Sequence, residues 1–173
     1  MDHARLQRMR DDFDSIYPLA DESERGTRFE VLMNDLFSYY TTLSKGGLRR
    51  DGEQIDGHFY LDNHQYYAEI RWKRKRASAA DISVLRDRAM AGFGGDTRAV
   101  FVSFEGFSGE ALTNLAGRAG ERVILVDGTD IHAVLDGRVG LDVLLMEKQM
   151  DIGQGQRAFV GVYEILAMIQ ARG

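Results

Sequence analysis

Two carboxylates and an arginine stand at a spacing that suits metal-dependent chemistry. Asp56 lies in one apolar-rich run, residues 55–61, and Glu69 and Arg71 lie in a second, residues 66–72. The four residues between the runs include Asp and Asn, which favour a tight turn, so the pattern predicts a β-hairpin. Asp56 and Glu69 would then be diagonal neighbours on one face, about 7–8 Å apart between backbones. Such a pair can converge on a hard divalent cation such as Mg²⁺, which prefers oxygen ligands.

The hairpin also has a plainer interpretation. Asp56 could end a strand and Glu69 could be a solvated strand residue, because exposed acids on strands are common.

A turn centred on Asn63 and His64 would place Asp56 opposite Arg71. The residues expected on the core face of the hairpin are Phe59, Leu61, Tyr66, Ala68, Ile70 and Trp72.

A run of positive charge follows the second strand. Five of the six residues from 71 to 76 are basic, and the run contains Lys73, Arg74, Lys75 and Arg76. Such a run is commonly a solvated edge, but beside a carboxylate pair it suits the phosphate backbone of DNA. His58 shares the face of the carboxylates and could contact phosphate, with an ordinary surface histidine as the alternative.

Composition restricts the class of protein. The 173 residues are 44% hydrophobic and 28% charged, which is typical of one soluble globular domain. The net charge of −5 argues against nonspecific polyanion binding by the whole surface, and the absence of cysteine excludes thiolate chemistry and disulfides. No apolar run reaches the roughly 20 residues that span a bilayer, and the N-terminus has no apolar signal core. We therefore expect a cytoplasmic protein without membrane contact.

Apolar periodicity predicts the elements around the hairpin. A short helix is expected within residues 1–20, and a core-facing helix capped by Asp21 or Ser23 follows. Residues 45–47 are expected to end that helix, and residues 48–54 to form a first short strand. The apolar stripe of the core-facing helix comprises Phe29, Leu32, Met33, Leu36, Phe37 and Tyr40.

The second half of the chain alternates helices with buried strands. Ser78 is expected to cap a helix with Asp81 in the capping-box position, and the glycine-rich residues 92–95 to end it. Residues 98–104 and 122–126 read as buried strands, joined by a helix that opens at Ser108. This βαβ arrangement makes the two strands parallel and the whole sheet mixed. Short helices are expected at 129–135 and 141–150, and the apolar segment 158–169 fits either a strand or a helix.

This order of elements and motifs resembles the PD-(D/E)xK restriction-endonuclease-like nucleases, in particular the Mrr-type domain of type IV restriction enzymes. The likeness covers about residues 21–146. It implies an α/β fold with an αβββαβ core and a mixed central sheet flanked by helices, with residues 1–20 as an N-terminal helical extension and 147–173 as a C-terminal extension. The residues that carry the resemblance are Ile55-Asp56, Glu69-Ile70-Arg71 thirteen residues later, Arg25-Gly26 with Phe29-Glu30, Asp81-Ile82, Arg86-Asp87-Arg88 and Gly106-Phe107-Ser108.

The resemblance implies a metal-dependent DNA endonuclease that hydrolyses phosphodiester bonds, in restriction or anti-phage defence. Asp56 and Glu69 would bind Mg²⁺, for which Mn²⁺ could substitute. Glu30, which by itself reads as an ordinary acid on a helix surface, would assist the metal site. The metal would lower the pKa of the water that attacks the phosphodiester in line.

One position departs from the family pattern. Where the family usually has Lys, two residues after the Glu, this chain has Arg71, which stays charged at any relevant pH and cannot act as a general base. Arg71 could still hold the scissile phosphate, and Lys73 is a displaced substitute on the same strand face. The alternative is therefore a catalytically impaired nuclease-fold protein that binds DNA or serves as an assembly subunit. A homodimer or a subunit of a larger defence complex is expected, because cutting a duplex needs two active sites or two visits.

Overall fold

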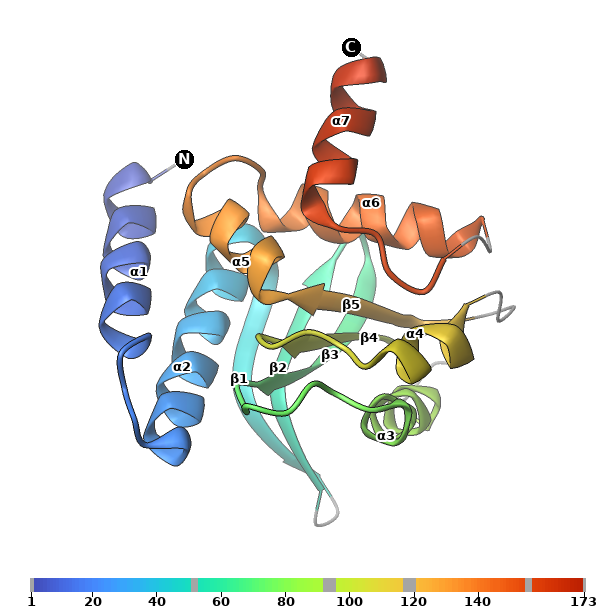
Figure 1. The fold of residues 1–173 in the computed structure, drawn as a ribbon, viewed down its shortest axis with the longest axis horizontal. Coiled ribbons are helices and arrows are strands. Elements are labelled where there is room, and N and C mark those ends of the chain that lie inside the picture. Colours follow the sequence, from blue (N-terminus) through green and yellow to red (C-terminus); the bar gives the residue numbers. More distant parts are fainter. Residues whose placement is uncertain (1, 51–52, 92–95, 117–120, 155–156, 173) are drawn as a thin grey trace.

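A five-stranded sheet lies between two layers of helices (Figure 1). The computed structural model describes residues 2–50, 53–91, 96–116, 121–154 and 157–172. The elements are α1 (His3–Ile16), α2 (Glu22–Tyr40), β1 (Thr42–Arg50), β2 (Glu53–Leu61), β3 (His64–Arg71), α3 (Ala79–Met90), β4 (Arg98–Ser103), α4 (Gly109–Leu115), β5 (Val123–Asp127), α5 (Gly128–Leu135), α6 (Leu141–Gly153) and α7 (Val162–Arg172).

The predicted hairpin is confirmed as β2 and β3, but its turn lies one residue earlier than predicted. Asp62 and Asn63 form the turn with φ angles of 49° and 61°, the left-handed geometry that a two-residue hairpin requires. Phe59 therefore pairs with Tyr66 rather than with Ala68. A shift of two positions in the pairing preserves the alternation of side chains, so the predicted core face of the hairpin is confirmed.

The shifted register changes the neighbours of the carboxylates. Gly57 pairs with Ala68, and Asp56 and Glu69 are the next residues on the two strands. The prediction that Asp56 stands opposite Arg71 and diagonal to Glu69 was therefore wrong. The two carboxylates are at the same level of the hairpin.

The start of the sheet also differs from the prediction. The core-facing helix α2 ends at Tyr40, and residues 45–47 lie inside β1 rather than at a helix end. Gly46 pairs with Gly57 on the neighbouring strand, beneath the side chain of Asn34 from α2. A Cβ atom on Gly57 would lie 2.9 Å from Asn34 Oδ1, so glycine allows the helix to approach the sheet closely.

The strand order is β1-β2-β3-β4-β5. β1, β2 and β3 pair antiparallel, whereas β4 is parallel to both β3 and β5. The mixed sheet and the parallel pair of buried strands are thus confirmed. The helix, three strands, helix and strand from α2 to β4 have the predicted αβββαβ order.

The helix caps follow the sequence signals. Asp21 caps α2 by accepting hydrogen bonds from two first-turn amides, Ser78 and Asp81 form a reciprocal capping box on α3, and Ser108 caps α4. The helices predicted near residues 1–20, 129–135 and 141–150 are α1, α5 and α6, and the unassigned segment ends in α7. The expected glycine stop at 92–95 lies outside the described residues.

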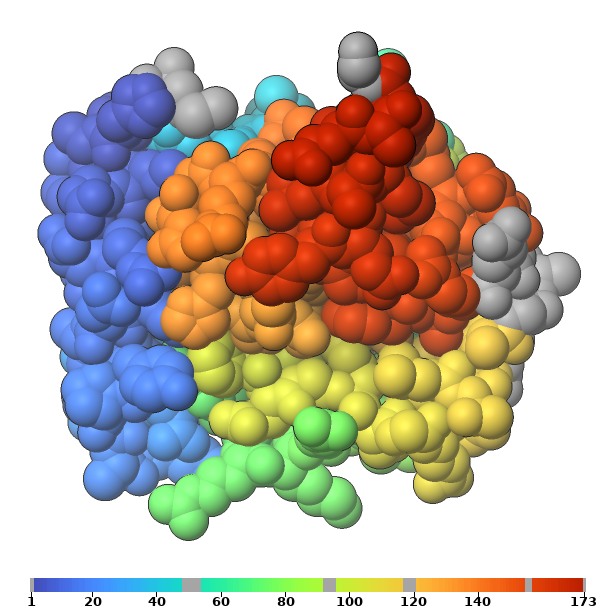
Figure 2. All heavy atoms as spheres, turned by 45° about the horizontal axis from the view of Figure 1, so that its top comes forward, coloured from blue at the N-terminus to red at the C-terminus, as the bar shows by residue number. Residues whose placement is uncertain are grey.

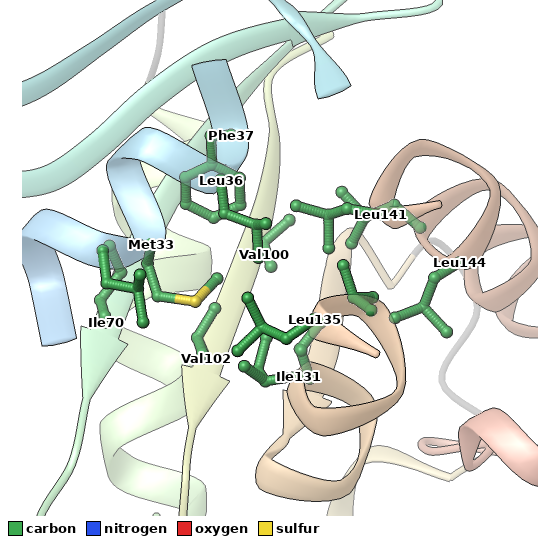
Figure 3. Close-up of a cluster of buried hydrophobic side chains, with 14 of the residues drawn as sticks. Met33, Leu36, Phe37, Ile70, Val100, Val102, Ile131, Leu135, Leu141 and Leu144 are labelled. Atoms are coloured by element: carbon green, nitrogen blue, oxygen red, sulfur yellow. The ribbon is translucent and has the colours of Figure 1, made fainter. Parts of the chain in front are cut away.

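Each face of the sheet has its own apolar core. One cluster packs α1, α2, α5, α6 and α7 on one face, and the other packs α3 and α4 on the opposite face. Figure 3 shows part of the first cluster, where α2, β3, β4, α5 and α6 meet through Met33, Leu36, Phe37, Ile70, Val100, Val102, Ile131, Leu135, Leu141 and Leu144. In the described part of the chain, no helix has the length and apolar character to cross a membrane.

Candidate active site

A cleft of about 570 Å³ opens where β3 ends beside the N-terminal half of α2. The same two elements meet at one edge of the molecule in Figure 1. Glu30, Asp56, Glu69 and Arg71 line this cleft together, as does Lys73. The other residues that line it are Glu22, Ser23, Gly26, Thr27, Ile70, Trp72 and Asp81. The four predicted catalytic side chains, from α2, β2 and β3, are therefore brought to one place.

Asp56 is held by hydrogen bonds from the neighbouring strand β3 and from the helix α2. Its Oδ2 accepts a hydrogen bond of 2.9 Å from the backbone N–H of Ile70 on β3. Its backbone carbonyl accepts a bond of 2.9 Å from Asn34 Nδ2, which also donates to the carbonyl of Glu30. These bonds join α2, β2 and β3 at the carboxylate, so its position depends on the tertiary contact of the helix with the glycine pair of the sheet.

Glu69 has the strongest electrostatic perturbation in the cleft. Burial, followed by the negative charge of Asp56, raises the pKa of Glu69 to about 7, although Arg88, Arg71 and Lys73 oppose the shift. Arg88 Nη1 on α3 lies 3.4 Å from Glu69 Oε2. The nearby cations therefore do not offset the cost of keeping this carboxylate charged, and a further positive charge would stabilise its ionised form.

The pKa values of Asp56 and Glu30 are raised as well. Burial raises the pKa of Asp56, and the amide of Ile70 and the charge of Arg88 oppose that change. Burial and then the charge of Asp56 raise the pKa of Glu30. Three carboxyl groups with raised pKa values in one cleft indicate a site that favours an added cation or a proton.

Arg71 is fixed by an acid from the next helix. Its Nη1 lies 2.9 Å from Asp81 Oδ1, and both side chains line the cleft. Burial alone would raise the pKa of Asp81, but hydrogen bonds from Ser78 and Arg71 outweigh burial and lower it. Asp81 therefore stays ionised, and Arg71 keeps a charged partner.

The basic run forms the connection from β3 to α3. Lys73, Arg74, Lys75 and Arg76 are all exposed, and Lys73 also lines the cleft. In Figure 2 the green segment that leaves β3 projects from the lower edge of the molecule. Its charge is thus available to a polyanion that approaches the cleft.

His58 does not line the cleft. Its Nε2 is 2.8 Å from the side-chain nitrogen of Gln65, and its ring packs edge-on against Tyr60. Both contacts lie farther along the hairpin toward the turn than Glu69 does. A role for His58 in binding DNA stays a prediction, with less support than the basic run has.

The carboxylates of the cleft suit Mg²⁺ better than they suit a metal whose ligands all come from the protein. Within the described ranges, no group of three acidic or histidine side chains could hold a metal by itself. Mg²⁺ is usually held by one or two carboxylates and completed by water and substrate phosphate. Asp56 and Glu69 share the cleft, and the charge of Asp56 adds to burial in raising the pKa of Glu69. The pair therefore matches that smaller requirement.

The pKa of Glu69 predicts how the metal-free protein responds to pH. Because the folded-state pKa is raised from 4.5 to about 7, the folded protein binds this proton more tightly than the unfolded chain does. Its stability therefore falls as the pH rises through that window. In EDTA at pH 8, Glu69→Gln should increase the free energy of unfolding by about 1–2 kcal/mol after allowance for partial solvent exposure. Denaturant unfolding at several pH values measures this difference.

The gain should be nearly absent at pH 4, where the wild-type carboxyl is mostly protonated in both states. Glu110→Gln, at an exposed position on α4, is the matched control and should change stability by less than about 0.5 kcal/mol. A loss of stability in Glu69→Gln at pH 8 would mark Glu69 as a structural residue.

Local sequence patterns missed three side chains that position the site. Asp81 has a recognisable capping signal, but nothing in its spacing indicates the bond to Arg71. Asn34 and Arg88 contact Asp56 and Glu69 from helices that are distant in sequence. For Asn34 the signal in the sequence was the pair of strand glycines, Gly46 and Gly57, because glycine inside a strand often marks the close approach of another element.

The αβββαβ core, with acidic residues at the end of its hairpin, defines the restriction-endonuclease-like class of α/β nuclease folds. The Mrr_cat family model, described as restriction endonuclease, matches residues 22–135. This range is more than half of the chain, and the chain therefore belongs to that family of nuclease domains. The match falls inside the domain expected at residues 21–146, whose exact limits stay a prediction.

A solved structure described as "Protein of Unknown Function AF1548" has a similar fold. The TM-score is 0.54 with 17% sequence identity, and the match covers 63% of this chain and 64% of that chain. At this identity the likeness concerns the fold alone. The comparison with curated proteins gave no match.

Proposed function

We propose that the protein is a Mg²⁺-dependent DNA endonuclease that acts in restriction or anti-phage defence. The observation that carries this proposal is the convergence of Glu30, Asp56, Glu69 and Arg71 in one cleft, in a chain of the restriction endonuclease family. A phosphodiester is the substrate that suits this set, because carboxylates for a cation stand beside fixed positive charge for phosphate.

The roles of the side chains follow from their surroundings. Asp56 and Glu69 would hold the cation, and when bound it would lower the pKa of water and neutralise charge on the phosphate. Arg71 would bind the scissile phosphate and stabilise the charge that develops on it, since a guanidinium offers several donors in a fixed plane. Glu30 would orient groups at the site from α2.

Nicking of supercoiled plasmid tests the proposal directly. Wild-type protein should convert supercoiled to open-circular DNA with Mg²⁺ or Mn²⁺, and EDTA should stop the reaction. Glu69→Ala should remove the activity while the protein stays folded. Cleavage that persists in EDTA or in Glu69→Ala would contradict the proposed site.

A second function is supported by one specific observation, the arginine at the position where lysine is usual. An impaired nuclease domain would bind DNA or serve as a subunit of a larger assembly, in which case wild-type protein would not nick. A gain of nicking in Arg71→Lys would then support this alternative. Loss of nicking in Arg71→Lys, from an active wild type, would instead support a role that requires the guanidinium.

The exposed basic run predicts the salt dependence of DNA binding. Replacing Lys73, Arg74, Lys75 and Arg76 by Gln removes charges that would release counterions from phosphate. Each lost phosphate contact should reduce the slope of log affinity against log salt by about 0.9. We expect weaker binding to duplex DNA of any sequence, measured by fluorescence anisotropy from low to physiological salt.

A control variant separates this effect from a change in net charge. Arg8, Lys45, Arg138 and Arg172 are four exposed basic residues outside the cleft, the same number of charges as in the basic run. Their replacement by Gln should alter the slope much less than the change to the basic run does. Equal slopes for wild type and the basic-run variant would exclude that run from the binding surface.

A further inference from the structure

We infer that Asp81 is a positioning residue of the active site, which acts by holding the Arg71 guanidinium in the cleft as a fixed phosphate-binding group. This inference rests on the proposed function and adds a residue to it. Asp81 comes from the first turn of α3, ten residues after Arg71, and both side chains line the cleft.

The two carboxylate oxygens of Asp81 have different partners. Oδ2 accepts hydrogen bonds of 2.8 Å from the backbone N–H of Ser78 and 2.7 Å from its hydroxyl, which completes the cap of α3. Oδ1 is 2.9 Å from Arg71 Nη1. The helix cap therefore orients the carboxylate, and the carboxylate orients the guanidinium.

Arg71 is also held through its backbone. Arg71 is the last residue of β3, where its carbonyl accepts a bond from the N–H of Phe104 after β4. Its side chain is only 17% exposed, and its Nε is enclosed by protein, so the guanidinium has little freedom to move. A guanidinium that is held by Asp81 and still lines the cleft is suited to bind an oxyanion without reorganisation.

An arginine at the lysine position can be oriented in a way that a lysine cannot. Lysine presents a single point charge on a flexible stem, whereas a guanidinium can pair with a carboxylate through one nitrogen and direct its other donors elsewhere. Asp81 would use one edge of that plane, and the phosphate would use another. The orientation of Arg71, in addition to its charge, would then determine how well substrate is bound.

A double-mutant cycle tests this inference. Asp81→Asn keeps an oxygen that can cap α3, but its amide presents a donor toward the Arg71 guanidinium in place of an acceptor. We expect Asp81→Asn to lower plasmid nicking by about 10- to 100-fold, the usual range for a residue that supports a site group. In the Arg71→Ala background the same change should have less than about a twofold effect, because the group that it positions is gone.

The matched control is Asp136→Asn, which removes another carboxylate partner of an arginine. Asp136 pairs with Arg10 on α1, outside the cleft, so this variant should nick at the wild-type rate. Duplex affinity in Ca²⁺ is measured in the same cycle and gives a second readout that does not require turnover. It should show the same lack of additivity between Asp81 and Arg71.

The outcomes distinguish this inference from the proposed function. Equal effects of Asp81→Asn in the two backgrounds, with an active or DNA-binding wild type, would overturn the positioning role alone. A fall in activity that follows only a fall in melting temperature would also overturn it, because it would mark Asp81 as a helix cap. A wild type that neither nicks nor binds DNA would overturn the proposed function and the inference with it.

Discussion

Glu69→Gln and Asp56→Asn are each expected to lower Mg²⁺-dependent nicking by about 1,000-fold, the effect of losing about 4 kcal/mol of transition-state stabilisation. Both substitutions keep the size of the side chain but remove the charge that would hold the cation. Single-turnover nicking of supercoiled plasmid, with the Mg²⁺ concentration varied, measures the loss. The apparent affinity for Mg²⁺ should fall together with the rate.

Glu110→Gln is the control for this pair, because Glu110 is exposed on α4 and does not line the cleft. It should nick at the wild-type rate. Glu69→Gln should also remain folded and, without metal at pH 8, be more stable than wild type. Inactive variants with greatly lowered melting temperatures would indicate that these acids maintain the fold.

Lys148→Met is expected to destabilise the protein by about 3–5 kcal/mol, because it leaves a buried carboxylate without its partner. Lys148 Nζ lies 2.8 Å from Asp130 Oδ2 and donates to the carbonyl of Val160 at 2.6 Å, and both charged side chains are almost completely buried. Asp130 Oδ1 also accepts a bond from the N–H of Val162. The pair therefore ties α5 and α6 to the start of α7, and denaturant unfolding measures its loss.

Two variants test the cause of this destabilisation. Lys45→Met removes an exposed lysine and should change stability by less than about 0.5 kcal/mol. Asp130→Asn combined with Lys148→Met should be less destabilised than the sum of the single changes, because neither charge is then buried alone. Additive effects would mean that the two groups contribute separately.

The sequence by itself determined the helices and the buried strands. The apolar stripe of α2 and the caps at Asp21, Ser78 and Ser108 depend on residues within one or two turns, so local patterns contain the necessary information. The apolar runs of β4 and β5 likewise required burial on both faces. The β1 strand was different, because Gly46 reads as a helix stop and becomes a strand residue only beneath Asn34.

The sequence also determined which side chains of the hairpin share a face. Strand alternation placed Asp56 with Glu69, and the shift of two positions in the register left that relation intact. The exact turn was less predictable, since Asp62, Asn63 and His64 all occur where the chain reverses. The conformations of Asp62 and Asn63 decide the register.

Only the tertiary structure decided what surrounds these carboxylates. Glu30 enters the cleft because α2 packs closely on the sheet, and Arg88 reaches Glu69 because α3 covers the opposite face. The bond from Asp81 to Arg71 depends on the path of the loop between β3 and α3. The spacing of side chains along one element predicts which of them share a face. Contacts between elements depend on how the layers pack, and no local pattern predicts that packing.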